Sequence, residues 1–379
     1  MTEKSLGAGL YIHIPFCQRK CPYCAFYSVP VSGRSMDRFA DALLREIDLY
    51  KITTPPETVY IGGGSPTCLP NETLIRLAHS LKQRFGSVEE FTVECNPAQA
   101  NAELLEGLRA SGVNRISIGA QSFDADELKV LGRLHDPGQI QTAVQSAQCA
   151  GFENIGLDLI FGLPDSNLMA WQNTLEKAMT LDVQHVSAYS LTIEKGTPFE
   201  KAVQQGSLTM IDEALERTMY ELACVQFEKA GFGHYEISNF ARPGFQCRHN
   251  LRYWKNRSVI GIGPASAGWY QGKRTTNVRD IDAYLTHIEA GRFARDEEQT
   301  PDLEQIAIET AVLNLRMRQG IDLAAYKQLT GFDLDELFGE AIQKNCDFGF
   351  LETTETHVYL TDLGLSFADT VAADFTSPD

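Results

Sequence analysis

Short β-branched and apolar runs alternate along the first half of the chain with longer stretches in which apolar residues lie three and four positions apart. The short runs predict buried strands at residues 10–14, 58–61, 91–95, 115–119, 155–161 and 185–191. The longer stretches predict helices with one apolar face, including residues 36–51, 71–85, 101–110 and 139–150. This βα repeat predicts an α/β fold with a parallel sheet. Six units fit an open or closed barrel, and periodicity alone leaves a doubly wound sheet as the alternative.

The residues that could carry chemistry fall at or near the ends of the predicted strands. In chain order they are the cysteines after the first strand, the glycine-rich loop 62–67, Glu94 and Asn96, Gln121, Asp158, and Tyr189 with Thr192. Barrel enzymes build their sites at the carboxyl ends of their strands. This placement therefore favours a barrel over a doubly wound sheet.

The pattern changes after about residue 240, and we predict three parts. Residues 1–240 form the barrel, residues 241–300 link it to the rest, and residues 301–379 form a small α+β domain of winged-helix type. In the linking part, the Pro- and Gly-interrupted segment 242–268 is expected to be an ordered loop; it contains Cys247, His249, Tyr253 and Trp254. In the last part, helical stretches precede two short strand runs around Phe350 and Val358, as in a helix group followed by a hairpin.

Charge and composition exclude some classes of function. The formal net charge is −17, and residues 301–379 hold four Lys/Arg against fifteen Asp/Glu, a balance of −11. Such a surface opposes nucleic-acid binding, so we expect no nucleic-acid partner and a protein-contact or lid role for the last domain. No apolar run reaches the roughly 18 residues of a membrane span. Nine cysteines without regular spacing suit a reducing compartment, which predicts a cytoplasmic protein.

Three cysteines, Cys17, Cys21 and Cys24, are crowded into eight residues as CxxxCxxC. A four-iron four-sulfur cluster normally takes four thiolates, whereas Phe26 stands two places after the third cysteine and Cys68 is expected to lie across the sheet. We therefore predict a cluster with one open iron that can bind a small molecule. A Cys3His zinc site using His13 and three unliganded thiols are the alternatives, although zinc motifs usually come as two separated pairs.

The segments Tyr11-Ile-His-Ile-Pro-Phe-Cys17 and Cys21-Pro-Tyr23-Cys24 resemble the radical S-adenosylmethionine superfamily. The likeness is to the branch that contains the anaerobic coproporphyrinogen III oxidase (HemN) and the haem chaperone HemW, and it runs nearly end to end. It implies a partial (β/α)6 TIM-like barrel, a four-iron four-sulfur cluster and S-adenosylmethionine. The oxidase has a further cysteine where this chain has Phe26, and His249-Asn-Leu-Arg-Tyr-Trp254 resembles the HNxxYW signature of the chaperone group, so both features favour the chaperone.

The resemblance also assigns residues to S-adenosylmethionine. Gly63, Gly64 and Ser65 would lie along its methionine part, and Glu94 would accept its ribose hydroxyls. Residues carried over from the family alone are Gln121, Arg133 and Asp158, with Tyr11 and Tyr23 beside the cluster loop. The simpler alternatives are glycines that only form a turn, a solvated or ion-paired Glu94, a surface Arg133, and an Asp158 bonded to backbone amides.

The function implied by the resemblance is binding of haem and its delivery to acceptor proteins such as respiratory enzymes. His249 is then the candidate axial ligand of the haem iron, with Cys247 as the alternative, since imidazole and thiolate both ligate haem. Residues 261–268 contain no histidine, whereas chaperone members often have a Gly/His run there. The competing hypotheses are radical decarboxylation of coproporphyrinogen III and radical modification of another substrate. A homodimer and docking to a membrane-bound acceptor are both compatible with the chain.

Overall fold

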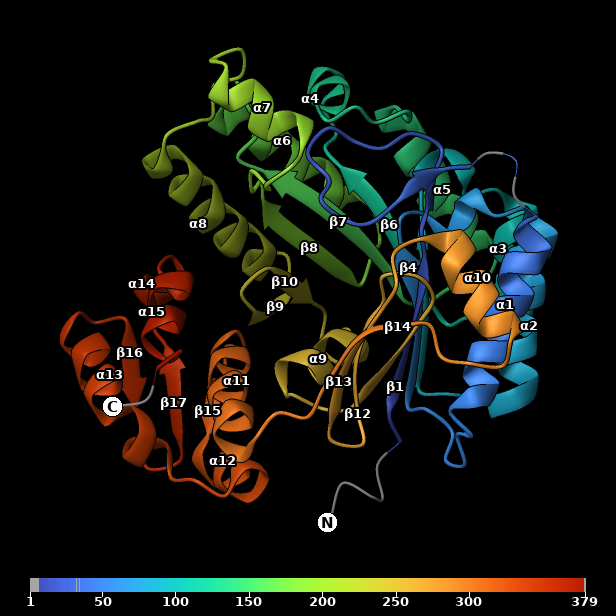
Figure 1. Ribbon diagram of the computed structural model, residues 1–379. Helices are drawn as coiled ribbons and strands as arrows, with labels where there is room; N and C mark the ends of the chain where they lie inside the picture. The colour runs from blue at the N-terminus through green and yellow to red at the C-terminus, as the bar shows by residue number, and fades with distance from the viewer. Residues whose placement is uncertain (1–6, 32, 34, 378–379) are drawn as a thin grey trace.

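The computed structural model describes residues 7–31, 33 and 35–377 (Figure 1). At its centre, six strands lie parallel and side by side in the order of the sequence. They are β1 (Gly9–Ile14), β4 (Thr58–Gly63), β5 (Glu90–Cys95), β6 (Arg115–Gln121), β7 (Ile155–Phe161) and β8 (His185–Ser190). All six predicted strands are confirmed to within two residues at each end.

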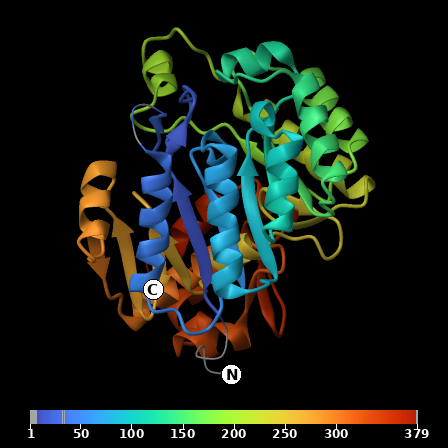
Figure 2. The same cartoon turned by 90° about the vertical axis from the view of Figure 1, so that its right-hand side faces the viewer.

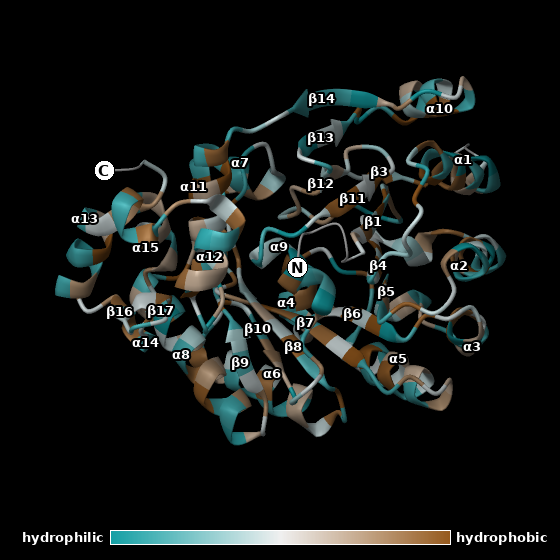
Figure 3. Cartoon of the chain, turned by 90° about the horizontal axis from the view of Figure 1, so that it is seen from below, coloured by the Kyte–Doolittle hydropathy of each residue, from teal (hydrophilic) through white to brown (hydrophobic). Residues whose placement is uncertain are grey.

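Helices cover only the outer, convex face of this sheet, as the view along the barrel in Figure 3 shows. They are α1 (Met36–Leu49), α2 (Asn71–Phe85), α3 (Ala102–Ala110), α5 (Pro137–Cys149), α6 (Leu168–Thr180) and α8 (Glu213–Lys229). Figure 2 looks onto the first of them from outside. A doubly wound sheet would carry helices on both faces, so the fold is the partial barrel. Short helices α4 (Ala125–Val130) and α7 (Pro198–Gln204) lie above the carboxyl ends of the strands.

Local sequence signals explain where the helices begin. Ser35 caps α1, because its side chain accepts a hydrogen bond from the backbone N–H of Arg38. Asp136 forms a capping box with Gln139, and Pro137 takes the first helical position of α5. The helix therefore begins at Pro137, two residues before the start that apolar spacing alone predicts.

The strands alternate between an apolar outer face and a polar inner face. Leu10, Ile12 and Ile14 of β1 are fully buried under the helices, as are their counterparts on the other strands. The residues between them point into the barrel. On the inner face these are Tyr11, His13, Tyr60, Thr92, Glu94, Arg115, Ser117, Asp158, His185 and Ser187. A polar interior is what a barrel needs in order to enclose a polar ligand rather than an apolar core.

Both edges of the parallel sheet are extended. Strand β11 (Val259–Ile262) pairs in parallel with β1 and continues antiparallel through β12 (Ala267–Tyr270), β13 (Lys273–Asn277) and β14 (Arg295–Gln299). On the other edge, β10 (Asn239–Ala241) pairs antiparallel with β8 and then with β9 (Gly233–Glu236). The predicted loop at residues 242–268 is thus wrong, since this segment holds helix α9 (Arg248–Trp254) and β11. Helix α10 (Ile281–Glu289) packs against α1.

The last part of the chain has a core of its own and the expected winged-helix character. Helices α11 (Leu303–Leu315), α12 (Leu323–Thr330) and α13 (Leu334–Asp347) precede the hairpin β16 (Leu351–Thr353) and β17 (His357–Leu360). The prediction omitted β15 (Ile321–Asp322), which pairs with β17, and the final helices α14 (Asp362–Leu365) and α15 (Ala368–Asp374). Helix α11 contacts α9, with Asn314 Nδ2 donating to the carbonyl of Trp254 at 2.7 Å.

Within the described residues, no helix combines the length and the apolar character needed to cross a membrane.

Candidate functional site

A cavity of ≈ 540 Å³ opens at the carboxyl ends of the parallel strands. Its walls come from the loop after β1, which includes β2 (Phe16–Cys17) and runs to β3 (Val29–Pro30), and from the ends of β4 to β8. The predicted site residues that line it are Cys17, Cys21, Tyr23, Cys24, Gly63, Gly64, Ser65, Glu94, Gln121, Arg133 and Asp158. The structure thus brings eleven predicted residues to one place.

The three cysteines of the loop are reduced, half-buried and face this cavity. Burial raises the pKa of the Cys17 thiol to about 11, and it raises the pKa of Cys24 as well. A cubane cluster places each thiolate on a different iron, and three thiols from one loop are the donor set that such a cluster uses.

The zinc alternative loses its fourth ligand in the structure. His13 Nδ1 lies 2.9 Å from the hydroxyl of Tyr11, and His13 Nε2 lies 3.0 Å from the carbonyl of Tyr27. Because both ring nitrogens are engaged away from the thiols, His13 is not free to complete a Cys3His site.

Cys68 was expected to lie across the sheet from the other cysteines. This expectation is wrong, because Cys68 lines the same cavity. The turn Pro66–Cys68 folds back over the cysteine loop, and Ser65 N–H donates to the carbonyl of Phe16 at 2.8 Å. Gln99 holds the thiol, with Nε2 donating to Cys68 Sγ at 3.5 Å. A fourth cysteine is therefore close to the predicted cluster, and its role becomes a point to test.

The glycines after β4 are required by close packing against the cysteine loop. Gly63 has φ +113°, and a Cβ there would lie 2.6 Å from the ring of His13. A Cβ on Gly64 would lie 2.7 Å from the carbonyl oxygen of Phe16, while its N–H donates to the carbonyl of Ile14 at 2.9 Å. Only glycine allows both approaches, so this loop forms a wall of the cavity directly beside Cys17.

Glu94 ends β5 at the cavity wall, and both of its oxygens are held. Tyr60 donates its hydroxyl to Oε1 at 2.8 Å, and the N–H of Gly63 donates to Oε2 at 3.1 Å. Desolvation raises the pKa of this carboxyl to about 7. The simple alternative of an ion pair is not found for Glu94, since both of its contacts are neutral donors.

Arg133, Gln121 and Asp158 form the wall opposite the glycine loop. Arg133 donates from Nη2 to the carbonyl of Gly119 at 2.9 Å and from Nη1 to Cys21 Sγ at 3.8 Å, so it is not a plain surface charge. Gln121 adopts φ +67°, a left-handed conformation that turns the chain at the end of β6. Asp158 accepts from Ser187 at 2.8 Å, and burial raises the pKa of its carboxyl.

The two tyrosines carried over from the family are placed differently. Tyr23 lines the cavity beside Cys21 and Cys24, whereas Tyr11 does not line it. Tyr11 points into the barrel below the cavity, where its ring lies near those of Tyr60 and His249.

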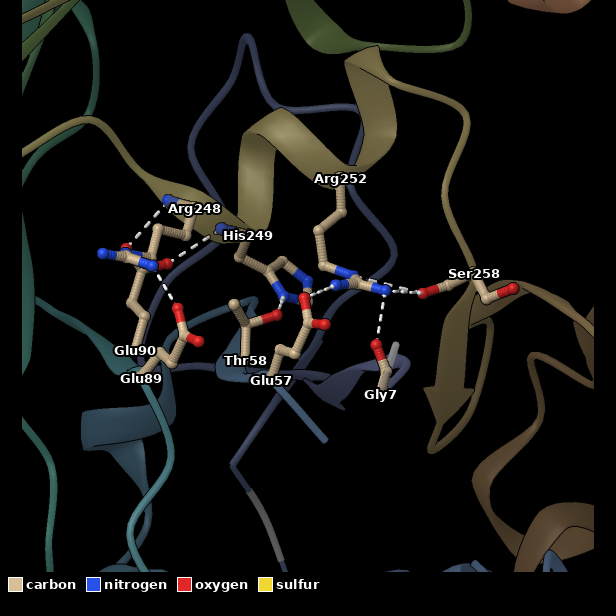
Figure 4. A network of polar contacts seen from close by, with 9 residues as sticks. All are labelled: Gly7, Glu57, Thr58, Glu89, Glu90, Arg248, His249, Arg252 and Ser258. Atoms are coloured by element: carbon tan, nitrogen blue, oxygen red, sulfur yellow. Dashed lines mark hydrogen bonds and ion pairs between the residues drawn. The ribbon is translucent and has the colours of Figure 1, made fainter. Parts of the chain in front are cut away.

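The opposite end of the barrel is closed by α9, which carries the HNxxYW-like motif (Figure 4). Glu90, at the start of β5, accepts the backbone N–H groups of Arg248 and His249 at 2.9 Å each. A carboxylate at a helix N-terminus satisfies free N–H groups and complements the helix dipole. Arg252 adds an ion pair with Glu57. The helix is therefore fastened to the strands as a floor.

His249 and Cys247 lie inside this floor and away from the cavity. His249 is 1 % exposed, and its Nδ1 lies 2.8 Å from the hydroxyl of Thr58. Its Nε2 has no hydrogen-bond partner among the described residues. Burial lowers the pKa of His249 to about 3, so the ring is neutral. Cys247 is fully buried, and burial raises the pKa of its thiol to about 12.

Tyr60, Ser117 and Cys68 are among the further cavity-lining residues that sequence reasoning missed. Tyr60 and Ser117 could have been found from the alternation along β4 and β6, since they share the inner face with predicted residues. No local signal indicates Cys68, because its position depends on how the turn after β4 folds.

Comparisons with known proteins agree with this architecture. Residues 11–178 match the radical SAM superfamily, and residues 302–367 match the HemN C-terminal domain. The heme chaperone HemW of Bacillus subtilis is 37% identical over 96% of this chain and 98% of its own length. HemW of Escherichia coli is 38% identical over 77% of this chain and 79% of its own. The solved coproporphyrinogen III oxidase HemN of Escherichia coli has the same fold, with a TM-score of 0.83 and 20% identity over 98% of this chain and 90% of that one.

A relative that is more than 30% identical across almost the whole of both chains shares its family with this protein. The chain belongs to the HemW family of the radical SAM superfamily.

Proposed function

We propose that this protein is a haem chaperone: it binds haem, holds a four-iron four-sulfur cluster with S-adenosylmethionine, and passes haem to acceptor proteins such as respiratory enzymes. The observation that carries the proposal is the near full-length likeness to proteins named as heme chaperones. Phe26 supports it, because the oxidase has a cysteine at this position. The Phe26 side chain is 68% exposed beside the cysteine loop.

Different residues of the cavity would hold the cluster and the separate parts of S-adenosylmethionine. Cys17, Cys21 and Cys24 would hold the cluster, and the glycine loop with Ser65 would lie along the methionine part of S-adenosylmethionine. Glu94 would accept the ribose hydroxyls in place of its present donors, the hydroxyl of Tyr60 and the N–H of Gly63. When bound and reduced, such a cluster would supply an electron to the sulfonium. The chain's own part is to orient the ligand and to exclude water.

For haem, we propose His249 as the iron ligand on the strength of its unpartnered Nε2. Because this ring is enclosed between α9 and the start of β4 at Thr58, ligation requires α9 to move away from the amino ends of the strands. The three cysteines proposed to hold the cluster lie at the other end of the barrel. Haem binding through His249 should therefore survive the loss of the cluster.

The test is an anaerobic titration of the reconstituted protein, first with haem and then with coproporphyrinogen III, following haem absorbance and porphyrin products together. We expect stoichiometric haem binding and no protoporphyrinogen. Turnover of coproporphyrinogen would replace the proposal with the oxidase function. Absence of both binding and turnover would leave the third hypothesis, radical modification of another substrate.

Cys17→Ser separates the two cofactors in the same titration. It should bind haem as the wild type does while lacking the cluster. His249→Ala should show the converse, with an intact cluster and an altered haem spectrum; an unchanged spectrum would remove His249 as the ligand.

A further inference from the structure

A second cavity, of ≈ 330 Å³, lies beside the end of α9 and outside the cofactor site. Small-molecule sites in proteins measure about 300–1,000 Å³. Tyr253, Asn256 and Arg257 line this cavity from α9 and the residues that follow it, and Leu313 lines it from α11. Strands β11 to β14 supply the remaining walls. The proposed sites of the cluster and of S-adenosylmethionine use none of these residues.

The strands present one face of their sheet to this cavity. Residues that pair directly across neighbouring strands point to the same side of a sheet. The register of β12, β13 and β14 therefore places six lining side chains on one face: Ala267, Trp269, Arg274, Thr276, Glu297 and Gln299. Val259 of β11 pairs with Trp269 and with Gly9 of β1, so this face continues the inner face of the barrel.

Aromatic rings and a fixed arginine form the deeper part of the cavity. Tyr253 and Trp269 are both half-buried. Arg274 lies over the ring of Trp269, 4.4 Å from its centroid. The same guanidinium donates to Asn256 Oδ1 at 2.8 Å and pairs with Glu309 of α11. Arg274 is therefore already engaged, and it braces the wall instead of offering a free charge.

Arg257 is the cation of this cavity that remains for a ligand. Its side chain is half-buried, and it forms no hydrogen bond or ion pair with any residue that the structure describes. A partly desolvated guanidinium binds a carboxylate through strong, charge-assisted hydrogen bonds. Glu297 is exposed on β14 and places one negative charge at the same cavity. The lining therefore suits a ligand with a flat apolar body and a carboxylate that reaches Arg257.

Tyr253 is the wall that this cavity shares with the proposed haem ligand. Its ring lies edge-on to that of His249, with the ring centroids 5.3 Å apart. Within the described part of the chain its hydroxyl has no hydrogen-bond partner, so packing alone holds the ring in place. Because Tyr253 belongs to α9, the movement of α9 that ligation requires would also withdraw this ring. The cavity would then open toward His249 Nε2.

We propose that this cavity is the docking site of haem, with a propionate paired to Arg257 and the porphyrin against Trp269 and Tyr253. The inference rests on the proposed function, and it names the residues that receive haem before the iron reaches its ligand. Haem matches the lining because a porphyrin is a flat apolar body with carboxylates at one edge. Glu297 repels a propionate, so Arg257 and Glu297 act on the affinity in opposite directions.

Titration of the full-length protein with ferric haem and with haem dimethyl ester, whose esterified propionates carry no charge, tests the ion pair. Arg257→Gln should weaken haem binding about tenfold, equivalent to about 1.4 kcal/mol, and leave binding of the ester unchanged. Glu297→Gln should tighten haem binding about threefold. Both variants should keep the wild-type spectrum of bound haem, because His249 is intact. Lys255→Gln is the matched control, since Lys255 is exposed and does not line the cavity, and its affinity should equal that of the wild type.

Thr276→Trp tests the space itself, because tryptophan suits a strand and its side chain would fill the cavity. Haem and the ester should both bind more weakly, while assembly of the cluster shows that the variant is folded. Unchanged haem affinity in Arg257→Gln and Thr276→Trp would overturn the docking site and leave haem binding standing, whereas a wild type that binds no haem would overturn the proposed function. An equal loss of haem and ester in Arg257→Gln would contradict the ion pair. Weaker haem binding in Arg279→Gln alone would place haem in the neighbouring cavity beside Phe26 and overturn the proposal.

Discussion

The two ends of the barrel stand on the same six strands but are built for different purposes. At the carboxyl ends, loops and glycines leave a cavity lined by half-buried cysteines and by carboxyls with raised pKa values. At the amino ends, α9 is fastened by Glu90 and by the ion pair of Arg252 with Glu57. The open end therefore has thiols and carboxyls suited to a cofactor site, whereas the charged residues at the closed end hold α9 in place.

The largest effect that separates the two ends is loss of the cluster. Cys17→Ser, Cys21→Ser and Cys24→Ser each remove one of the predicted thiolates, and each should abolish cluster assembly. Iron and sulfide content and the visible absorbance after anaerobic reconstitution provide the measurement.

Cys68→Ser and Cys149→Ser are the matched controls for this experiment. Cys68 lines the same cavity, whereas Cys149 is exposed elsewhere. Both variants should keep the cluster. If Cys68→Ser also loses it, the iron that we leave open for S-adenosylmethionine has a fourth protein ligand.

At the closed end, Arg252→Ala should lower the free energy of unfolding by about 3–5 kcal/mol. The arginine side chain is 9% exposed, and its removal takes away the donors that it provides to Glu57 and to the carbonyl of Gly7. Arg248→Ala, on the same helix, breaks an exposed pair with Glu89 and should cost less than about 1 kcal/mol. Urea unfolding measures both, and equal losses would contradict the role of Arg252 as the fastening residue.

At the open end, Glu94 should make the free energy of unfolding depend on pH. Because burial raises its pKa from 4.5 to about 7, the folded state keeps a proton that the unfolded state releases between these values. Stability from this group is therefore present at pH 4 and is lost as the pH rises to about 7. Glu94→Gln should be more stable than the wild type by about 2 kcal/mol at pH 8 and nearly equal at pH 4. Glu106→Gln, at an exposed site, should show no such difference between the two pH values.

Comparison of sequence and structure shows which features are local. The strands and most helix limits follow from apolar spacing, and the position of Asp158 and Glu94 at one cavity follows from the parallel order of their strands. Strand β11 and helix α9 were not predicted, because one pairs with β1 and the other is capped by Glu90, both far away in the sequence. Cys68 was misplaced for the same reason. The alternation of Tyr60, Ser117 and Asp158 with apolar residues was visible, and it would have indicated a polar barrel interior.

The smallest effect concerns the movement of α9 when haem binds. If His249 ligates haem, α9 must move away from the strands, so its amide hydrogens should exchange about tenfold faster in the haem complex, equivalent to about 1.4 kcal/mol of lost protection. Hydrogen exchange followed by mass spectrometry measures this, and the amides of α1 serve as the internal reference because that helix contacts neither His249 nor the cavity. His249→Gln should abolish the change. Faster exchange in the cysteine loop instead of α9 would place the haem at the open end, and the contrast between a cofactor end and a closed end would then no longer hold.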